Sequence, residues 1–139
     1  MVHSISGIPS PKKIKFLHIG IACSNMLSCR SFIKHAMNVV SESETVFDEN
    51  QNASVCLLTL RGGLTLELIS GPVVAGIVKK GMTYYHTCYS VPDIEETVSF
   101  LRKKHNVTLI SEIKPGKIFN GRRVVFLYTP IGIVELLED

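Results

Sequence analysis

Short runs of hydrophobic residues, each about the length of a β-strand, recur along the chain and surround two segments predicted to be helical, the second with apolar residues at helical spacing. The helical segments are residues 25–37 and 93–105. Each opens on a side chain that can accept backbone N–H groups, Asn25 or Asp93, which predicts a helix N-cap. The pattern predicts strands at residues 16–23, 39–46, 54–60, 64–69, 84–91, 107–113, 122–128 and 133–137. Many strands with two helices between them indicate the α+β class.

The chain contains an internal duplication. When it is shifted by 68 positions, residues 14–70 lie over residues 82–138 without a gap, and ten of the 57 aligned pairs are identical. Average composition gives roughly three or four identities by chance. Each copy has the order βαβββ, so we expect two modules of one domain, joined by a linker at residues 71–81 and preceded by a loose tail at residues 1–13.

Two kinds of polar residue recur inside the apolar strands of both copies. His18 and His86 each lie at the third position of the opening strand, and Glu67 and Glu135 each lie in the closing strand, 49 positions after their histidine. A buried carboxylate is costly unless it is paired or binds a metal ion. Because this cost arises twice at equivalent positions, each time with a histidine, the pattern predicts a metal site.

Pairing of the two modules about a pseudo-twofold axis would bring the four side chains to one point. Two neutral imidazoles and two carboxylates balance the charge of a divalent ion, and this ligand set favours cobalt, nickel, manganese or zinc over calcium. Two positions of a six-coordinate ion would stay open for water or substrate, which permits catalysis. The residues leave open whether the modules pair within one chain or between the chains of a swapped dimer.

The same residues carry a resemblance to a known family. From Lys15 to Glu138 the chain resembles the vicinal oxygen chelate superfamily, also called the glyoxalase/bleomycin-resistance fold, through the segments HIGIA, LELI, YHTCYSVPDIEETVSFL and VELLE. The resemblance implies paired βαβββ modules that form an open, cup-shaped mixed sheet around a divalent metal ion. It also implies that the four metal ligands are His18, Glu67, His86 and Glu135.

Two members of that superfamily are similar to different parts of the chain. Residues 71–93 and 109–135 resemble methylmalonyl-CoA epimerase, in which the second metal ligand is usually Gln. The ligand set of this chain, with Glu67 in that place, resembles bacterial metal-dependent glyoxalase I. The epimerase family has a further acid/base residue before the third strand of the first module, and the nearest positions here are Glu49 and Asn50.

The resemblance implies a divalent-metal-dependent isomerase that removes a proton alpha to a carbonyl through a metal-stabilised enolate, as methylmalonyl-CoA epimerase does. Glu135 and Glu67 would be the catalytic carboxylates, and the substrate would be a small molecule such as an acyl-CoA thioester. A lactoylglutathione lyase like glyoxalase I is one alternative. A non-catalytic small-molecule-binding protein of the same fold is the other.

Charge and composition exclude several classes of binding partner and location. The net charge of +3 comes with no dominant block of Lys or Arg, so we expect no nucleic-acid partner, and no apolar stretch is long enough to span a membrane. The first residues show no secretory signal, so we expect a cytoplasmic homodimer whose four cysteines are reduced core residues. The repeated residues Phe32 and Phe100 predict helix faces that pack on the sheet.

Overall fold

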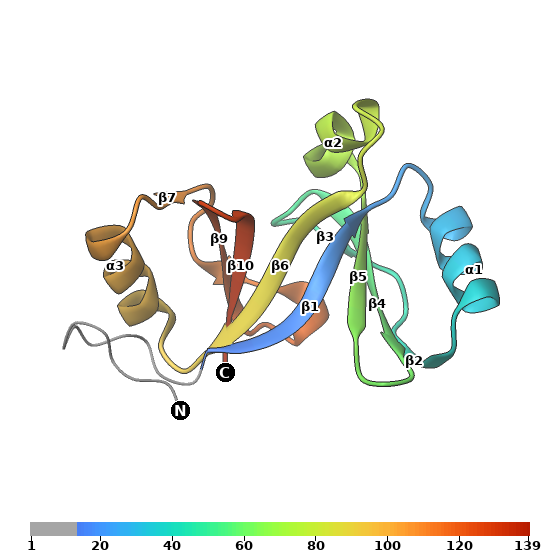
Figure 1. Ribbon diagram of the computed structural model, residues 1–139, viewed down its shortest axis with the longest axis horizontal. Helices are drawn as coiled ribbons and strands as arrows, with labels where there is room; N and C mark the ends of the chain where they lie inside the picture. Colours follow the sequence, from blue (N-terminus) through green and yellow to red (C-terminus); the bar gives the residue numbers. More distant parts are fainter. Residues whose placement is uncertain (1–13) are drawn as a thin grey trace.

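The computed structural model describes residues 14–139, so the expected tail at residues 1–13 lies outside the described residues. Two units of similar order follow one another (Figure 1). The first consists of β1 (Lys15–Ala22), α1 (Met26–Ala36), β2 (Val39–Glu42), β3 (Val46–Asp48), β4 (Ala53–Leu60) and β5 (Thr65–Ser70). The second consists of β6 (Tyr84–Val91), α3 (Ile94–Lys104), β7 (Thr108–Leu109), β8 (Lys114–Pro115), the short 3-10 helix η2 (Lys117–Phe119), β9 (Arg123–Thr129) and β10 (Gly132–Glu138). The α+β class and the repeated units are therefore confirmed.

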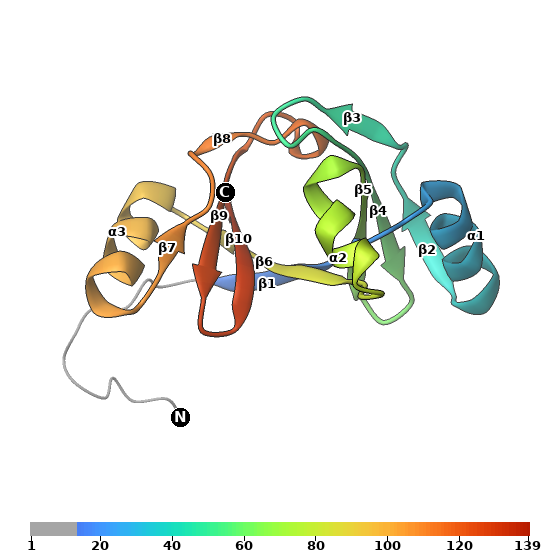
Figure 2. The same cartoon turned by 90° about the horizontal axis from the view of Figure 1, so that it is seen from above.

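The strands form a single mixed sheet with the order β2-β4-β5-β1-β6-β10-β9-β7. In its centre β1 runs antiparallel to β6, while each of these two strands runs parallel to the closing strand of its own unit, β5 or β10. The two units are thus joined within one chain by the β1–β6 ladder. Figure 2 shows the two arms of the sheet on either side of this central pair, with α1 and α3 on their outer sides.

Among residues 14–139, four clusters of buried apolar residues hold these layers together, the smallest of which consists of Cys88, Phe119, Val124 and Leu137. Each outer helix covers its own arm of the sheet, and the concave side contains a cluster of its own. The cluster under α1 consists of Cys23, Ile33, Cys56, Leu58, Leu66 and Leu68. The cluster under α3 consists of Val91, Ile94, Val98, Val125, Leu127, Val134 and Leu136. The cluster on the concave side consists of Ala22, Ala53, Val55, Ile69, Val74, Tyr85 and Phe126.

The helices begin where their caps predict. The side chain of Asn25 accepts a hydrogen bond from the Ser28 amide, and that of Asp93 accepts one from the Glu96 amide, both at 2.9 Å. The prediction for Phe32 is wrong, because its side chain is 62% exposed. On the helix α1, Ile33 is the buried residue instead.

In each unit, the second expected strand is interrupted, and the interruptions lie at equivalent positions. The expected strand 39–46 is divided into β2 and β3, and of the expected strand 107–113 only β7 forms. At each irregularity a serine hydroxyl replaces a backbone acceptor: Ser43 accepts from the Leu57 amide at 2.8 Å, and Ser111 accepts from the Phe126 amide at 3.0 Å. These serines are an identical pair in the duplication, so the deviation itself is repeated.

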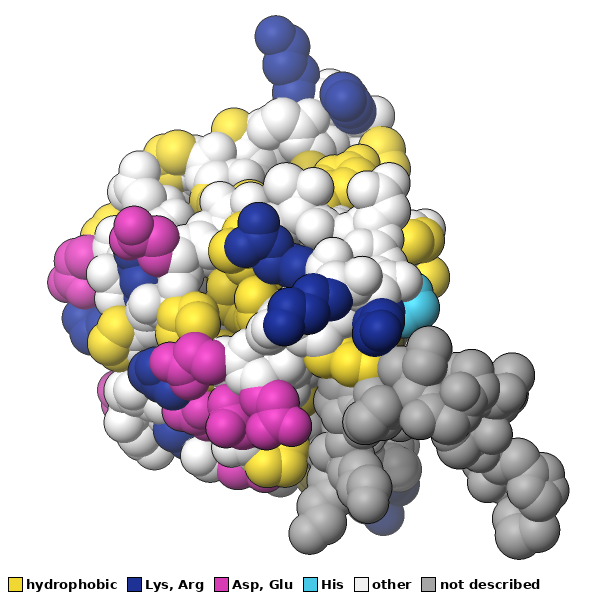
Figure 3. All heavy atoms as spheres, turned by 90° about the vertical axis from the view of Figure 1, so that its left-hand side faces the viewer, with side chains coloured by type: hydrophobic (Ala, Val, Ile, Leu, Met, Phe, Trp, Pro, Cys, Tyr) yellow, Lys and Arg dark blue, Asp and Glu magenta, His cyan; other side chains and the backbone are white. Residues whose placement is uncertain are grey.

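The segment expected as a linker, residues 71–81, contains the 3-10 helix η1 (Pro72–Val74) and the short helix α2 (Ala75–Lys79). Figure 1 shows α2 beyond the upper ends of β5 and β6. No helix among residues 14–139 combines the length and the hydropathy needed to cross a membrane. On the side of the molecule that carries α3, acidic and basic side chains occur together (Figure 3).

Candidate metal centre

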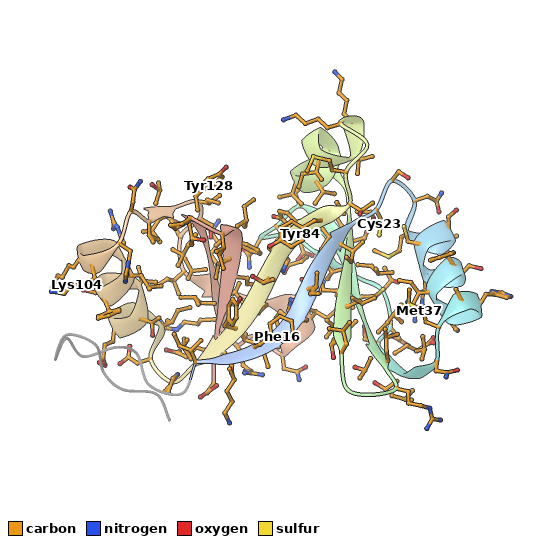
Figure 4. The ribbon with its side chains drawn as sticks, in the orientation of Figure 1. Phe16, Cys23, Met37, Tyr84, Lys104 and Tyr128 are labelled. Atoms are coloured by element: carbon orange, nitrogen blue, oxygen red, sulfur yellow. The ribbon has the colours of Figure 1, made fainter. Side chains whose placement is uncertain are left out.

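The four repeated polar residues lie on the four adjacent central strands of the sheet. His18 belongs to β1, His86 to β6, Glu67 to β5 and Glu135 to β10. In Figure 4, Phe16 and Tyr84, each two residues before one of the histidines, mark the two ends of the β1–β6 pair. The antiparallel ladder therefore brings residues 68 positions apart to the middle of the sheet.

Their ligand atoms converge on one point. The Nε2 atoms of His18 and His86 lie 3.3 Å apart. Oε1 of Glu67 lies 3.2 Å from both Nε2 atoms, and Oε1 of Glu135 lies 3.2 Å from that of His18 and 3.0 Å from that of His86. All four ligand atoms lie within 4.8 Å of one another.

These distances fit a shared metal ion. Ligand atoms bonded to one ion at about 2.1 Å lie roughly 3.0 Å apart at neighbouring corners of an octahedron and roughly 3.4 Å apart in a tetrahedron. The side chains are buried, with 2% exposure for His18 and 0% for the other three. Several polar atoms of the cluster have no hydrogen-bond partner: Nδ1 of His86, both carboxylate oxygens of Glu67, and Oε2 of Glu135. Because unpartnered buried oxygens are costly, the donor set fits a divalent cation, and the group could hold one.

Without a cation the cluster retains protons. Burial would lower the pKa of His18, but the neighbouring carboxylates of Glu135 and Glu67 together raise it to about 9. The pKa of His86 is raised against its burial by the same two carboxylates. Burial would raise the pKa of Glu135, but its hydrogen bonds with His18 and His86 lower it to about 2. The carboxylate of Glu135 is thus charged and ready to bind a cation.

Aromatic rings enclose the two imidazoles. The ring of Phe119, from η2, stacks on His18 with a centroid distance of 5.7 Å. Tyr85 and Phe126 contact the edge or face of His86 at centroid distances of 4.7 and 5.3 Å. The same two rings line a neighbouring pocket of about 180 Å³. The pocket therefore lies next to two of the rings that pack against His86.

The turn between β3 and β4 contributes two residues, Asn50 and Gln51, to the lining of this pocket. Asn50 lines the pocket, and its side chain donates a hydrogen bond to the Pro115 carbonyl at 3.1 Å. Glu49 does not line the pocket; its side chain is 73% exposed and lies 3.4 Å from the ammonium group of Lys117. Of the two positions considered for a second acid/base residue, the one at the pocket is therefore an amide.

Three further residues lie near the site, and of these the sequence offered only Tyr85, as an aromatic strand residue expected to serve in packing. Asp48 is 1% exposed, and its carboxylate accepts hydrogen bonds from the backbone of Asn50 and Lys117 and from the side chain of Gln51. Tyr85 and Phe119 supply the aromatic walls. In the sequence, Tyr85 can be recognised only as a residue of an apolar strand. Phe119 cannot be recognised from the duplication, because its partner in the other copy is Gln51.

Solved structures of similar fold cover nearly the whole chain. They include a hypothetical protein from Bacillus halodurans C-125 (24% identity, TM-score 0.70, 92% of this chain and 96% of that chain). Methylmalonyl-CoA epimerase from Mycobacterium tuberculosis matches with 20% identity and a TM-score of 0.71 over 95% of this chain and 93% of that chain. A substituted methylmalonyl-CoA epimerase from Streptomyces coelicolor, in complex with 2-nitronate-propionyl-CoA, matches with 22% identity and a TM-score of 0.68 over 90% and 96%.

At these identities the structural matches show a shared fold. Among curated proteins no sequence match to this chain was found. The family model described as the glyoxalase/bleomycin resistance protein/dioxygenase superfamily matches residues 17–126, which is most of the chain. The expected superfamily is thus confirmed: the chain belongs to the glyoxalase/bleomycin resistance protein/dioxygenase superfamily.

Proposed function

We propose that the protein is a divalent-metal-dependent isomerase that removes and returns a proton alpha to the carbonyl of an acyl-CoA thioester, as methylmalonyl-CoA epimerase does. The observation that carries the proposal is the convergence of two imidazoles and two carboxylates at one buried point beside an apolar pocket. The folds of several methylmalonyl-CoA epimerases support it, among them one in complex with methylmalonyl-CoA. The homodimer and the cytoplasmic location expected from the sequence stay predictions.

His18, Glu67, His86 and Glu135 would hold the ion. When bound, a divalent ion supplies positive charge for the carbonyl oxygen on which negative charge develops as the alpha proton leaves. The four protein ligands fix the place of that charge, because they lie on adjacent strands of a rigid sheet. Phe119, Tyr85 and Phe126 keep bulk water away from the imidazoles, which strengthens the electrostatic interactions there.

Glu135 and Glu67 are the proposed proton-transfer groups. The Oε2 atom of each carboxylate lacks a hydrogen-bond partner, so it is free to accept a proton. The two residues are duplication partners and belong to opposite sides of the pseudo-twofold axis, which would let each serve one face of the alpha carbon. The low pKa of Glu135 requires its bonds to the histidines, so release of those bonds would make it a stronger base.

The pocket is consistent with the acyl end of such a substrate. Its volume of about 180 Å³ suits a short acyl chain, whereas the nucleotide part of CoA would have to stay outside. Its lining includes Val73, Tyr85 and Phe126, together with the two charged residues Glu112 and Lys114. A combination of apolar walls and a few polar groups is the usual character of a small-molecule site.

One observation favours a second candidate, a lyase like glyoxalase I. The ligand set contains Glu67, and the turn that would supply a further acid/base residue to an epimerase presents Asn50 at the pocket and Glu49 to solvent. A reaction that needs fewer acid/base groups would not require that residue.

The test begins with metal analysis of the purified protein, followed by two assays on the metal-loaded form. One assay measures exchange of the alpha proton of methylmalonyl-CoA in deuterated water by NMR. The other measures conversion of the hemithioacetal of methylglyoxal and glutathione. We expect one ion per chain and rapid exchange with methylmalonyl-CoA, reduced at least 100-fold in Glu135→Gln or Glu67→Gln and unchanged in the exposed control Glu44→Gln.

Each alternative outcome has a different meaning. Turnover of the hemithioacetal without exchange of methylmalonyl-CoA would replace the proposal by the lyase. Bound metal without either reaction would favour a binding protein of the same fold. Absence of metal after reconstitution with cobalt, nickel, manganese and zinc would overturn the proposed chemistry altogether.

A further inference from the structure

We propose that Gly20 is a positioning residue for His86: the missing side chain at Gly20 creates the space in which the imidazole lies across β1 and reaches the other ligands. The inference rests on the proposed metal centre for its functional meaning. The contact between the two residues is independent of any ion.

The space above Gly20 is filled by the ring of His86. A Cβ atom added at Gly20 would overlap this imidazole, and even the ligand atom Nε2 would be only 2.8 Å away. The neighbour cannot simply move aside, because His86 is 0% exposed and its ring is packed against Tyr85 and Phe126. Any side chain at position 20 must therefore displace the ligand.

The backbone gives no other reason for a glycine here. Gly20 is not among the glycines with positive φ, so an L-residue could adopt its conformation in β1. What distinguishes the position is its place in the sheet. Gly20 lies opposite Glu67 on one side and opposite His86 on the other, so it separates two of the four ligands in one row across three strands. The side chains of His86 and Glu67 must reach across Gly20, because Nε2 of His86 and Oε1 of Glu67 lie 3.2 Å apart.

The equivalent position in the half of the cluster that contains His18 and Glu135 does not need a glycine. The duplication partner of Gly20 is Cys88, which lies between His18 and Glu135 in the equivalent row. There a side chain is accommodated, and the ring of His18 stacks on Phe119. The two halves of the pseudo-symmetric site thus place their imidazoles differently, and only the His86 half depends on a glycine.

The first measurement is metal affinity of Gly20→Ala by competition with a chelator. Displacement of one ligand predicts a loss of about 10- to 100-fold, the range found when residues that orient metal ligands are changed. The absorption spectrum of the cobalt-loaded variant should change as well, because it reports the geometry of the ligands. The matched control is Gly76→Ala in α2, where a Cβ atom meets nothing within 4 Å and wild-type affinity is expected. Wild-type affinity and an unchanged spectrum in Gly20→Ala would overturn the proposal.

A double-mutant cycle separates positioning from general strand packing. In a His86→Ala background the ring is gone, so adding Gly20→Ala should cause less than a twofold further loss of affinity. A further loss of tenfold or more in that background would overturn the proposal, because the alanine would then act through something other than His86.

The same cycle on the melting temperature of the metal-free protein distinguishes this inference from the proposed function. We expect Gly20→Ala to lower the melting temperature of the wild type and to leave that of His86→Ala unchanged. If the wild type bound no metal, the proposed function would fail, but this thermal cycle would still decide whether Gly20 makes room for His86. Equal destabilisation in both backgrounds would overturn the inference.

Discussion

The ring of Phe119 stacks on the imidazole of His18, with planes inclined by only 12° and centroids 5.7 Å apart. His18 comes from β1 of the first unit and Phe119 from η2 of the second, so the contact joins the two units over the site. Phe119 is 9% exposed, and its neighbours in η2 are held down by the hydrogen bond from the Lys117 amide to Asp48. Phe119 therefore covers one side of the candidate metal centre.

Truncation of this cover should weaken the fold and open the site. For Phe119→Ala we expect the free energy of unfolding, measured by denaturant titration, to fall by about 3 kcal/mol. We also expect a chelator to remove the metal ion at least tenfold faster. Phe32→Ala is the matched control, because that ring is 62% exposed and should affect neither quantity. An unchanged rate of metal removal in Phe119→Ala would show that another segment covers the ion.

The four residues of the candidate metal centre could be predicted because the duplication acts as an internal comparison. A single buried carboxylate such as Glu67 has many explanations, whereas the same residue type at the same place in two copies, each with a histidine, points to a shared partner. In the structure, antiparallel pairing of β1 with β6 is enough to bring His18 and His86 together.

The cover of the site could not be predicted in the same way. Phe119 and Asp48 act through contacts between the two units, and their duplication partners, Gln51 and Gly116, have different chemistry. The division of the expected strand 39–46 could not be predicted either, because it depends on side-chain contacts with Arg30 on the helix α1. The guanidinium of Arg30 donates to the Ser43 carbonyl at 2.6 Å and to the Thr45 hydroxyl at 2.9 Å, which satisfies polar groups that a continuous strand would have paired.

The N-cap of α3 provides a test of the sequence reasoning. Asp93→Ala removes the acceptor of the Glu96 amide at the first turn, so we expect the free energy of unfolding to fall by about 1 kcal/mol. Asp93→Asn keeps an acceptor oxygen and should lie within a few tenths of a kcal/mol of the wild type. Equal loss in the two variants would indicate that charge, and not the capping hydrogen bond, is what stabilises the helix.

The exposed position of Glu49 makes a prediction about the second acid/base residue. Its carboxylate faces Lys117 and solvent, so Glu49→Gln should change the rate of alpha-proton exchange by less than twofold. Deuterium exchange into methylmalonyl-CoA, followed by NMR, measures this directly. A loss of more than tenfold would mean that the β3–β4 turn moves during the reaction and brings Glu49 to the substrate.

Metal binding should release protons. At pH 7.5 His18, with a pKa of about 9, is mostly protonated in the metal-free protein, and an imidazolium cannot bind a cation. We expect at least one proton to be released for each ion bound, and the apparent affinity to rise about tenfold per pH unit up to pH 9. Calorimetry in buffers of different ionisation enthalpy measures the proton count. A count of zero at pH 7.5 would contradict a protonated cluster.

The same groups set the pH dependence of stability in the metal-free protein. Because folding raises the pKa of His18 from 6.5 to about 9, its contribution is complete below pH 6.5 and is lost as the pH rises through 9. Because folding lowers the pKa of Glu135 from 4.5 to about 2, its contribution is complete above pH 4.5 and is lost as the pH falls through 2. The melting temperature of the metal-free protein should therefore be highest between pH 4.5 and 6.5. In the metal-loaded protein the decrease between pH 6.5 and 9 should disappear, because the ion replaces the protons; a decrease of equal size in both forms would place its origin outside this cluster.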